Sequence, residues 1–487
     1  MEENAMKTTL KRFRTACCIP LLLLALLLGA PGCAERPTAP DAEPSSFSGT
    51  LPEPSSELPP QTASPTTEAL PENTAPGTEA PATAEDETEA PSEPLSVEDA
   101  VRMYEAAPLD YTPVEREPEQ PLAPVSEPRY ELGTDGFWRG SEGSDGAAVL
   151  MLTGDLICQT RQQEAAKTDS GYDFRGSFHY VQPVFAEADL VIGNLEATLS
   201  EHAPYMAEQP AVEGRPHLNA PASYLEALRF AGFDLVVMSN NHNCDAGVRG
   251  IYETLDRVEE AGLIHTGTFR NEREPRFVLV EVNGIRFGLM SYATYFNKKD
   301  AHLNAEGVRT LLNPYDPETA ARDAAAAREA GAEYLLVYIH WGTEYTNTPN
   351  EKQYRIAREL ADAGFDFIVG SHPHALQPFD SVTSADGRTV PVIYSMGNFV
   401  SHQKKTVTKD TLILRLVFAR DEAGKVVLAE QGYIPCRVFK RFGEYDYAVV
   451  PLTEPYRQGL RSAYFAPALE RIREVLGPLL PCLGEAE

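Results

Sequence analysis

Residues 334–345 read YLLVYIHWGTEY, and residues 367–374 read FIVGSHPH. Each stretch starts with a short apolar run, typical of a buried β-strand, and ends in polar residues that include histidine. Residues 350–363, which lie between the two stretches, have the apolar spacing of a helix. A strand, a helix and a second strand in this order predict two parallel strands joined by a helical crossover.

The same alternation extends over most of the chain from Gly146 onward. Further strands are expected at residues 147–152, 190–192, 235–238 and 390–394, and further helices at residues 222–231, 249–261 and 317–330. Residues 277–282 and 285–292 flank Asn283-Gly284, a strong signal of a type I′ hairpin. A second β pair is expected at residues 411–418 and 426–433. The sequence therefore predicts a mixed α/β fold, with two packed sheets and helices outside.

Polar side chains follow six of the predicted strands. In chain order they are Asp155; Asn194 and Glu196; Asn240, Asn241, His242 and Asp245; His340; His372 and His374; and Asn398. Ligands of open α/β sheets bind in the crevice outside the carboxyl ends of the strands. We therefore expect these side chains to meet at one edge of the fold.

Carboxylate, carboxamide and imidazole groups together suit divalent transition metals such as Zn, Mn, Fe or Ni. The set is large enough for two ions, which can activate a water and stabilise both oxygens of a displacement. Each motif alone has a simpler explanation, because Gly154-Asp155 could be a turn or a helix cap and His340 a packed histidine. The segment His372-Pro373-His374 is expected to be extended, so that both imidazoles point the same way. Four histidines just past strand ends favour the metal site.

Six ordered motifs carry a family resemblance. They are Gly154-Asp155; Asn194-Leu195-Glu196; Asn240-Asn241-His242 with Asp245 and Gly247; His340-Trp341-Gly342 with Glu344-Tyr345; His372-Pro373-His374 with Gln377; and Ser395 with Gly397-Asn398-Phe399. Together they resemble the CapA family of poly-γ-glutamate capsule synthesis proteins, which belongs to the metallophosphatase-like superfamily. The resemblance covers residues 147–435. It implies a four-layer sandwich, in which two mixed β-sheets are flanked by helices.

The resemblance also implies roles for individual residues. The implied ligands of one or two divalent ions (Mn, Zn or Fe) are Asp155, Glu196, Asn241, His340, His372 and His374. His242 stands where the superfamily often has an acid that protonates the leaving group, and Asp245 either orients it or forms a loop salt bridge. Asn194 and Asn398 are implied to support the ligands or to bind substrate. The first motif lacks the superfamily's Asp-x-His pattern, so the number of ions and the hydrolysis of phosphoesters stay open.

Trp341 follows His340 directly and has two possible roles. It could cover the metal site and contact substrate, or it could be an aromatic residue of the core. Contact with the site is the role we expect.

The N-terminal region predicts export. Basic residues between Lys7 and Arg14 precede an apolar run at 19–28, which is too short to span a bilayer and typical of a secretory signal. The run ends near Cys33 in a pattern that resembles a lipobox, so residues 1–33 are expected to be a lipoprotein signal peptide with Cys33 lipidated. An uncleaved anchor is the alternative.

Residues 34–145 are rich in Pro, Ser, Thr and Glu and are expected to form a disordered tether, with a short helix possible within residues 97–107. Residues 146–440 would then be the CapA-like domain, and residues 441–487 a C-terminal extension that packs on it. A disulfide between Cys436 and Cys482 is conceivable outside the cytoplasm, and their pairing stays open.

The formal net charge of −30 disfavours nucleic acid as a partner. We expect a lipoprotein on the outer face of the bacterial cell membrane, which takes part in capsule or poly-γ-glutamate synthesis or processing. Its site would be a metal-dependent hydrolase-like site that cleaves a phosphoester or an amide. The expected partners are an anionic surface polymer or phosphoester substrate, the membrane through the lipid anchor, and membrane polymer-synthesis proteins. The alternative is a non-catalytic scaffold subunit of a polymer synthesis or export complex.

Overall fold

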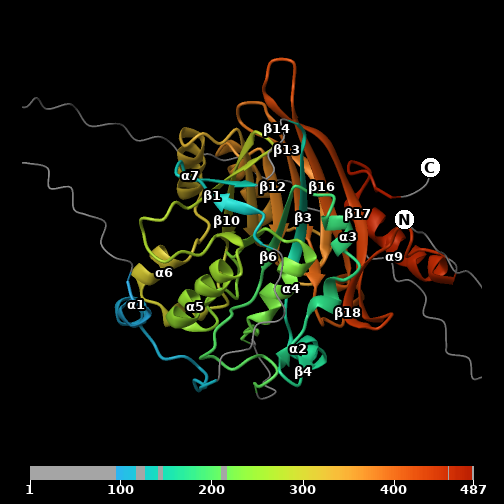
Figure 1. Cartoon of the computed structure of the whole chain (residues 1–487). Coiled ribbons are helices and arrows are strands. Elements are labelled where there is room, and N and C mark those ends of the chain that lie inside the picture. Colours follow the sequence, from blue (N-terminus) through green and yellow to red (C-terminus); the bar gives the residue numbers. More distant parts are fainter. Residues whose placement is uncertain (1–94, 117–126, 141–145, 210–216, 459, 485–487) are drawn as a thin grey trace, which may run out of the picture. The chain divides into compact units, whose positions relative to one another are not determined.

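Two large mixed β-sheets form the centre of the fold in the computed structural model (Figure 1). The structure describes residues 95–116, 127–140, 146–209, 217–458 and 460–484. The expected signal peptide, the lipidated Cys33 and residues 34–94 of the expected tether lie outside the described residues. Within the described part of the chain, no helix combines the length and the apolar character needed to cross a membrane.

The first sheet has eight strands in the order β1-β2-β9-β10-β11-β12-β14-β13. Their bounds are β1 (Tyr130–Leu132), β2 (Phe137–Gly140), β9 (Val278–Val282), β10 (Ile285–Ala293), β11 (Tyr334–His340), β12 (Phe367–Ser371), β13 (Leu376–Thr383) and β14 (Thr389–Met396). Strands β10, β11, β12 and β14 run parallel. The expected hairpin joins β9 to β10, with Asn283 and Gly284 at φ 49° and 75° in its turn.

The second sheet has the order β18-β17-β16-β3-β6-β7-β8, and β15 pairs with β3 beside this path. Its strands are β3 (Ala148–Leu156), β6 (Leu190–Leu195), β7 (Leu235–Val237), β8 (Ile264–Thr266), β15 (Asn398–Val400), β16 (Asp410–Arg420), β17 (Val426–Phe442) and β18 (Tyr445–Pro451). Strands β3, β6, β7 and β8 run parallel, whereas β16, β17 and β18 are antiparallel neighbours. A separate pair consists of β4 (Lys167–Thr168) and β5 (Gly171–Tyr172).

The described helices connect and cover these strands. They are α1 (Val97–Tyr104), α2 (Thr160–Ala166), α3 (Gln182–Phe185), α4 (Ser223–Ala231), α5 (Gly247–Glu260), α6 (Ala305–Leu311), α7 (Pro317–Glu329), α8 (Glu351–Asp362) and α9 (Leu460–Leu476), with 3₁₀ turns η1 (Arg175–Phe178), η2 (Lys299–His302) and η3 (Thr406–Thr408). Helix α8 begins with a capping box, because Asn350 accepts from the backbone N–H of Gln353 while the Gln353 side chain accepts from that of Asn350.

Three apolar cores define four layers. Leu150 and Leu152 of β3 face the other sheet, whereas Met151 between them packs with helices α4 and α5 on the outer face. Val337 of β11 lies in the third core, with residues of α7 and α8 such as Leu360. The order is therefore helices, sheet, sheet, helices, and the expected four-layer α/β fold is confirmed. Both sheets are covered on both faces, which explains why their parallel strands are apolar throughout.

The folded part begins earlier than Gly146, where the sequence placed it. Helix α1 and strands β1 and β2 lie within the expected tether, and β2 pairs in parallel with β9, with Phe137 opposite Leu279. The described parts of residues 34–145 are therefore not all tether. Strands β1 and β2 are too short to be stable alone, and β2 joins them to the edge of the sheet by pairing with β9. Strand β17 also runs through residue 440 to Phe442, so the sheet continues across the expected start of the C-terminal extension.

The C-terminal helix α9 closes one side of the core between the sheets. Its Leu469, Ile472 and Leu476 are buried in the same cluster as the inward side chains of both sheets. The four described cysteines are free thiols, so Cys436 and Cys482 form no disulfide here. Cys482 instead forms an isolated β-bridge with Tyr433.

Candidate metal centre

The carboxyl ends of the parallel strands of both sheets meet at one edge of the fold. Asp155 and Asn194 are opposite each other near the ends of β3 and β6, and His340 is the last residue of β11, opposite Ser371 of β12. The turns that follow β6, β7 and β12 carry the remaining candidates, Glu196, Asn241, His242, His372 and His374. The structure thus brings together residues that are far apart in the sequence.

Asp155, Glu196 and His374 form the first group of possible ligands. One ligand atom from each lies within 4.8 Å of the other two. The Nδ1 atom of His374 is 3.1 Å from Oδ2 of Asp155, and its Nε2 atom is 3.8 Å from Oε1 of Glu196. All three side chains are buried.

Glu196 is the residue whose surroundings most require a cation. It is fully buried, and neither of its carboxylate oxygens has a hydrogen-bond partner among the described residues. Burial, followed by the negative charge of Asp155, raises the pKa of Glu196 well above its ordinary range. A buried carboxylate without partners is strongly destabilising unless it takes up a proton or a positive charge compensates it.

His340, His372 and Asn241 extend the group on the side of the first sheet. The Nε2 atom of His340 is 2.8 Å from Oδ1 of Asn241 and 3.1 Å from Nδ1 of His372, while its Nδ1 atom is held 2.9 Å from Oγ of Ser371. Burial, followed by the neighbouring imidazoles, lowers the pKa of both His340 and His372 well below the ordinary range. Both rings are therefore neutral, which is the form that binds metals.

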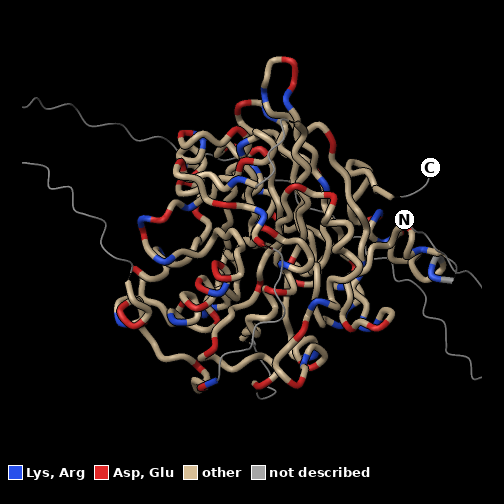
Figure 2. The backbone as a smooth tube through the Cα atoms, in the orientation of Figure 1, with Lys and Arg blue, Asp and Glu red and all other residues tan. Residues whose placement is uncertain are grey.

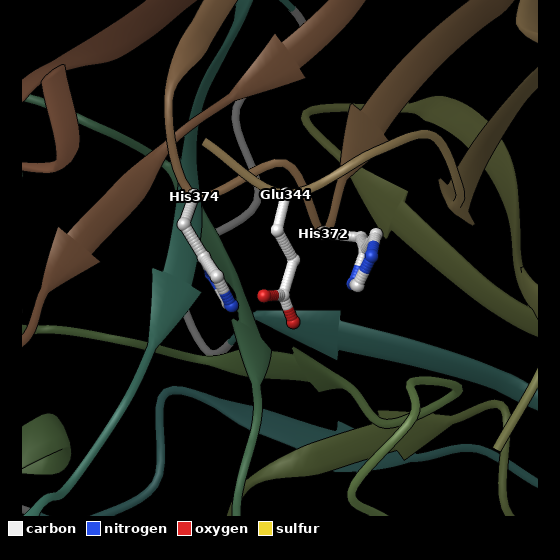
Figure 3. Close-up of side chains that lie close together, drawn as sticks. All are labelled: Glu344, His372 and His374. Carbon is white, nitrogen blue, oxygen red and sulfur yellow. The ribbon is translucent and has the colours of Figure 1, made fainter. Parts of the chain in front are cut away.

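Glu344 completes a second group that the sequence interpretation missed. Its carboxylate lies between His372 and His374 (Figure 3), and ligand atoms of these three residues are within 4.8 Å of one another. His374 therefore belongs to both groups. The available signal was the position of Glu344 four residues after His340, in a loop that follows a strand end.

His242 and Asp245 form a dyad beside these groups. The Nδ1 atom of His242 is 2.7 Å from Oδ2 of Asp245, which also accepts the backbone N–H of Leu218 at 2.7 Å. The other ring nitrogen, Nε2, lies 3.3 Å from Nδ2 of Asn297. Asp245 thus contacts His242 within the same loop and also holds the backbone of Leu218, a geometry that fits both orientation of the ring and an ion pair when the ring is protonated.

A cavity of about 580 Å³ opens onto the cluster. Among the residues that line it are Gln159, His242, Tyr295, Asn297, Glu344, Tyr345, His372, His374 and Gln403. Tyr295 and Asn297 were not identified from the sequence, although the Tyr295 hydroxyl contacts the ring of His372 at 3.1 Å from Nδ1. They follow β10, whose end carries no histidine or carboxylate to draw attention to it.

The donor set fits a divalent cation. It combines neutral imidazoles with buried carboxylates, and mixed nitrogen and oxygen ligands of this kind suit transition metals better than Ca²⁺ or Mg²⁺. The orphaned oxygens of Glu196 are the sign, from the structure itself, that the cluster is built for a positive charge.

The candidate ligands lie within a segment that matches a known family. The model of the family described as bacterial capsule synthesis protein PGA_cap matches residues 149–403. The chain belongs to this family. The expectation from the six sequence motifs is confirmed at this level.

Three relatives with similar sequences each match part of this chain. The chain is 30% identical over 285 residues to the PGA biosynthesis protein CapA of Bacillus subtilis, which covers 58% of this chain and 70% of that protein. It is 30% identical over 270 residues to the capsule biosynthesis protein CapA of Bacillus anthracis, which covers 55% of this chain and 63% of that protein. A probable polyglutamine synthesis accessory protein of Mycobacterium tuberculosis is 25% identical over 222 residues, or 44% of this chain and 55% of that protein.

The solved structures that resemble this chain have much lower sequence identity to it than these relatives do. The calcineurin-like phosphoesterase YfkN from Bacillus subtilis gives a TM-score of 0.39 at 14% identity, covering 60% of this chain and 90% of that chain. The sulfate thiohydrolase SoxB from Thermus thermophilus gives a TM-score of 0.36 at 10% identity, covering 69% of this chain and 62% of that chain. Scores this low carry no argument about the chemistry of the site.

Trp341 has a different place from the one expected. Its side chain is fully buried in the core between the first sheet and α7 and α8, and its indole N–H donates to the carbonyl of Tyr394 at 2.8 Å. The expected contact with substrate is therefore wrong. Strand residues alternate between faces, so Trp341, next to His340, points to the helices instead of the cavity.

Asn194 and Asn398 are buried and act through other residues of the family site. Asn194 donates to Oδ1 of Asp155 at 2.9 Å and accepts from Asn240 at 3.2 Å, so it orients a candidate ligand. Asn398 donates to Ser401 at 2.9 Å and to Gln403 at 3.0 Å and thereby holds a loop at the cavity wall. Of the two roles expected for these residues, support and substrate binding, their positions fit support, because both are buried and neither lines the cavity.

The segment His372-Pro373-His374 is a turn and not the extended segment expected. His372 has φ 93° and His374 has φ 57°, both in the left-handed region that favours glycine. The two rings still lie together, with centroids 5.8 Å apart. Strained backbone of this kind persists where the surroundings determine the conformation, and it often occurs at functional sites.

Proposed function

We propose that this chain is a metal-dependent hydrolase that acts on an anionic polymer during capsule or poly-γ-glutamate synthesis or processing. The observation that carries the proposal is Glu196, a buried carboxylate with no hydrogen-bond partner among the described residues, surrounded by Asp155, His340 and His374. The names of the Bacillus relatives, which refer to PGA and capsule biosynthesis, support the biological context.

Seven residues would hold one or two divalent ions (Mn, Zn or Fe). They are Asp155, Glu196, Asn241, His340, Glu344, His372 and His374. A bound divalent ion supplies Lewis-acid polarisation of the scissile phosphoryl or carbonyl group and favours ionisation of water. Ser371 and Asn194 keep His340 and Asp155 oriented through hydrogen bonds of 2.9 Å each.

His242 is the proposed general acid. In hydrolysis a water oxygen forms a bond to phosphorus or to the carbonyl carbon and gives up a proton to solvent, the bond to the leaving oxygen or nitrogen breaks, and the leaving atom takes up a proton. His242 lines the cavity and can deliver that proton from Nε2, while Asp245 stabilises the protonated ring at Nδ1. Asn297, 3.3 Å from Nε2, holds the ring in place between turnovers.

The proposed location is the outer face of the bacterial cell membrane, with Cys33 as the lipidated residue. The basic N-terminal segment, the apolar run at 19–28 and Cys33 support it. At that location the proposed substrate is an anionic surface polymer, and membrane polymer-synthesis proteins are the proposed partners.

The test is metal analysis combined with two hydrolysis assays. The full chain, His374→Ala and the control His179→Ala are loaded with Mn²⁺ or Zn²⁺ and dialysed, and metal per chain is measured. His179 is an exposed histidine away from the cluster. Activity is followed on a phosphodiester and on γ-linked glutamate oligomers.

We expect bound metal and turnover in the wild type and in His179→Ala, with both strongly reduced in His374→Ala. A wild type that keeps no metal and cleaves neither substrate would overturn the proposal. It would favour the alternative, a non-catalytic scaffold subunit.

A further inference from the structure

A second cavity, of about 760 Å³, lies next to the candidate metal centre and is lined by cations. We call it the basic pocket and define it by Arg161, His402, Lys404, Lys409 and Lys440. The chain as a whole is strongly acidic, with a net charge of −30, and Asp and Glu are spread over the described chain in Figure 2. The positive charge gathered in this cavity is therefore opposite in sign to the net charge of the chain.

The acidic residues of this cavity offset only part of its charge, because Glu164 neutralises Arg161 and leaves the three lysines. The two that line it are Glu164 and Asp446, and each is paired with an arginine. Glu164 lies 2.5 Å from Arg161, and Asp446 lies 2.7 Å from Arg441. Among the described residues, by contrast, no carboxylate forms an ion pair with Lys404, Lys409 or Lys440.

The positive charges in the pocket also affect the imidazole of His402. Burial, followed by the charges of Lys404, Arg161 and Lys440, lowers the pKa of His402 below its ordinary value. His402 is therefore neutral near pH 7, and the lysines dominate the potential in the pocket. Cations collected in a concave surface attract anions more strongly than the same charges spread over a flat surface.

The basic pocket and the metal-site cavity are neighbours that share a lining residue. Gln403 lines both cavities, and Asn398 holds it through a hydrogen bond of 3.0 Å. The side chain of Gln159, which also lines the metal-site cavity, accepts the backbone N–H of His402 at 2.9 Å. The loop between the cavities also carries Lys405, whose Nζ lies 3.8 Å from the ring centroid of Tyr345.

We propose that the basic pocket is a binding subsite for a second segment of an anionic polymer, one segment of which occupies the metal centre. The proposal rests on the proposed function and adds the place where the polymer is held. Lys404, Lys409 and Lys440 bind successive carboxylates, and the Gln403 loop separates the bound segment from the site of cleavage. Lysine suits this role because its flexible stem lets a point charge follow irregularly spaced anions.

The contribution of each lysine follows from the strength of exposed ion pairs. Removing one such lysine weakens binding roughly two- to fivefold, and removing all three weakens it by about tenfold or more. Because the pairs are exposed, added salt weakens them. Affinity for the polymer is thus expected to fall steeply between 50 mM and about 500 mM salt.

The test measures binding of labelled poly-γ-glutamate by fluorescence anisotropy, with EDTA and with Mn²⁺. The full chain is compared with K404A/K409A/K440A, with the charge-preserving K404R/K409R/K440R, and with the control K167A/K352A/K425A. The control lysines are exposed and lie outside the basic pocket and the metal-site cavity. K404A/K440A, which changes only exposed residues, guards against misfolding. Polyphosphate and neutral dextran serve as competitors.

We expect the alanine triple variant to lose about tenfold or more in affinity, the arginine variant and the control to bind like the wild type, and dextran not to compete. Equal affinity of the wild type and the alanine variants, or no binding by the wild type in either condition, would overturn the proposal. Polyphosphate that binds far better than poly-γ-glutamate would overturn the carboxylate assignment. Because binding is read without turnover, a failure here is distinct from an absence of metal or hydrolysis.

Discussion

The Oε1 atom of Glu196 lies 3.8 Å from the Nε2 atom of His374. The carboxylate follows a strand of one sheet, and the imidazole follows a strand of the other, so this approach joins the two halves of the sandwich. Glu196 is fully buried and its oxygens have no hydrogen-bond partner among the described residues. The pair therefore marks the position where the proposed cation would compensate the buried carboxylate.

Glu196→Gln is expected to stabilise the metal-free protein and to abolish tight metal binding. At neutral pH the buried Glu196 must either take up a proton or carry a charge, and glutamine removes this cost, which should raise the free energy of unfolding by on the order of 1–3 kcal/mol. Urea unfolding in EDTA measures the first effect, and metal per chain after dialysis measures the second. A variant that is less stable than the wild type in EDTA would contradict the prediction.

The stability of the metal-free wild type should also fall as pH rises. The pKa of Glu196 in the folded chain is raised above its ordinary value of 4.5, so above that pH the folded chain holds a proton that the unfolded chain has lost. The contribution of Glu196 is therefore lost progressively as pH increases from about 4.5 towards the folded pKa. The free energy of unfolding of the wild type and of Glu196→Gln is measured from about pH 5 to about pH 8. The difference between the slopes of these two free energies against pH gives the contribution of Glu196.

Asp245→Asn is expected to lower kcat by about 10²-fold or more while leaving metal content unchanged. Asparagine can still accept from the backbone N–H of Leu218 but cannot stabilise a protonated His242 through its Nδ1. Hydrolysis rates over a range of pH, together with metal analysis, check this expectation. Loss of metal in the variant would show that Asp245 supports the cluster and not the proton transfer.

Gly154→Ala is expected to destabilise the fold by about 3–5 kcal/mol. A Cβ atom at Gly154 would lie 1.9 Å from the carbonyl oxygen of Gly397, where the chain passes from β14 of one sheet to β15 of the other. The matched control is Gly140→Ala, whose Cβ would meet its nearest neighbour at 3.6 Å. Thermal unfolding of both variants makes the comparison, and equal shifts would contradict the close approach.

Trp341→Phe is expected to lower stability by about 1–3 kcal/mol, because the carbonyl of Tyr394 loses the indole N–H that it accepts. The substitution should leave metal content and KM unchanged, since the side chain faces the helices. A raised KM with unchanged stability would contradict this prediction and indicate that Trp341 contacts the substrate.

Much of the fold could be predicted because its signals are local. The apolar runs that became β11 and β12, the helix between them and the Asn283-Gly284 turn each depend on residues close in the sequence. Strands β1 and β2 could not be predicted, because both are short, β1 pairs with β2, and β2 depends on pairing with β9, more than a hundred residues away.

Some residues of the candidate site could likewise be predicted from the sequence, and others could not. Asp155, Glu196, His340 and His374 were found because each lies at or just past the end of a strand, and strand ends of parallel sheets meet at one edge. Glu344 was passed over because it is exposed in a loop, and its approach to His372 and His374 depends on how that loop turns. Trp341 was misplaced because sequence adjacency to a ligand does not decide which face of a strand a side chain occupies.

The sequence by itself determined which residue types stand at the strand ends and therefore the family and the kind of ion the site can hold. Only the tertiary structure decided which side chains share the cluster, which are buried supports, and that a basic pocket adjoins it. The reason is physical: periodicity and turn chemistry act over a few residues, whereas a carboxylate left without partners arises only when two sheets pack face to face.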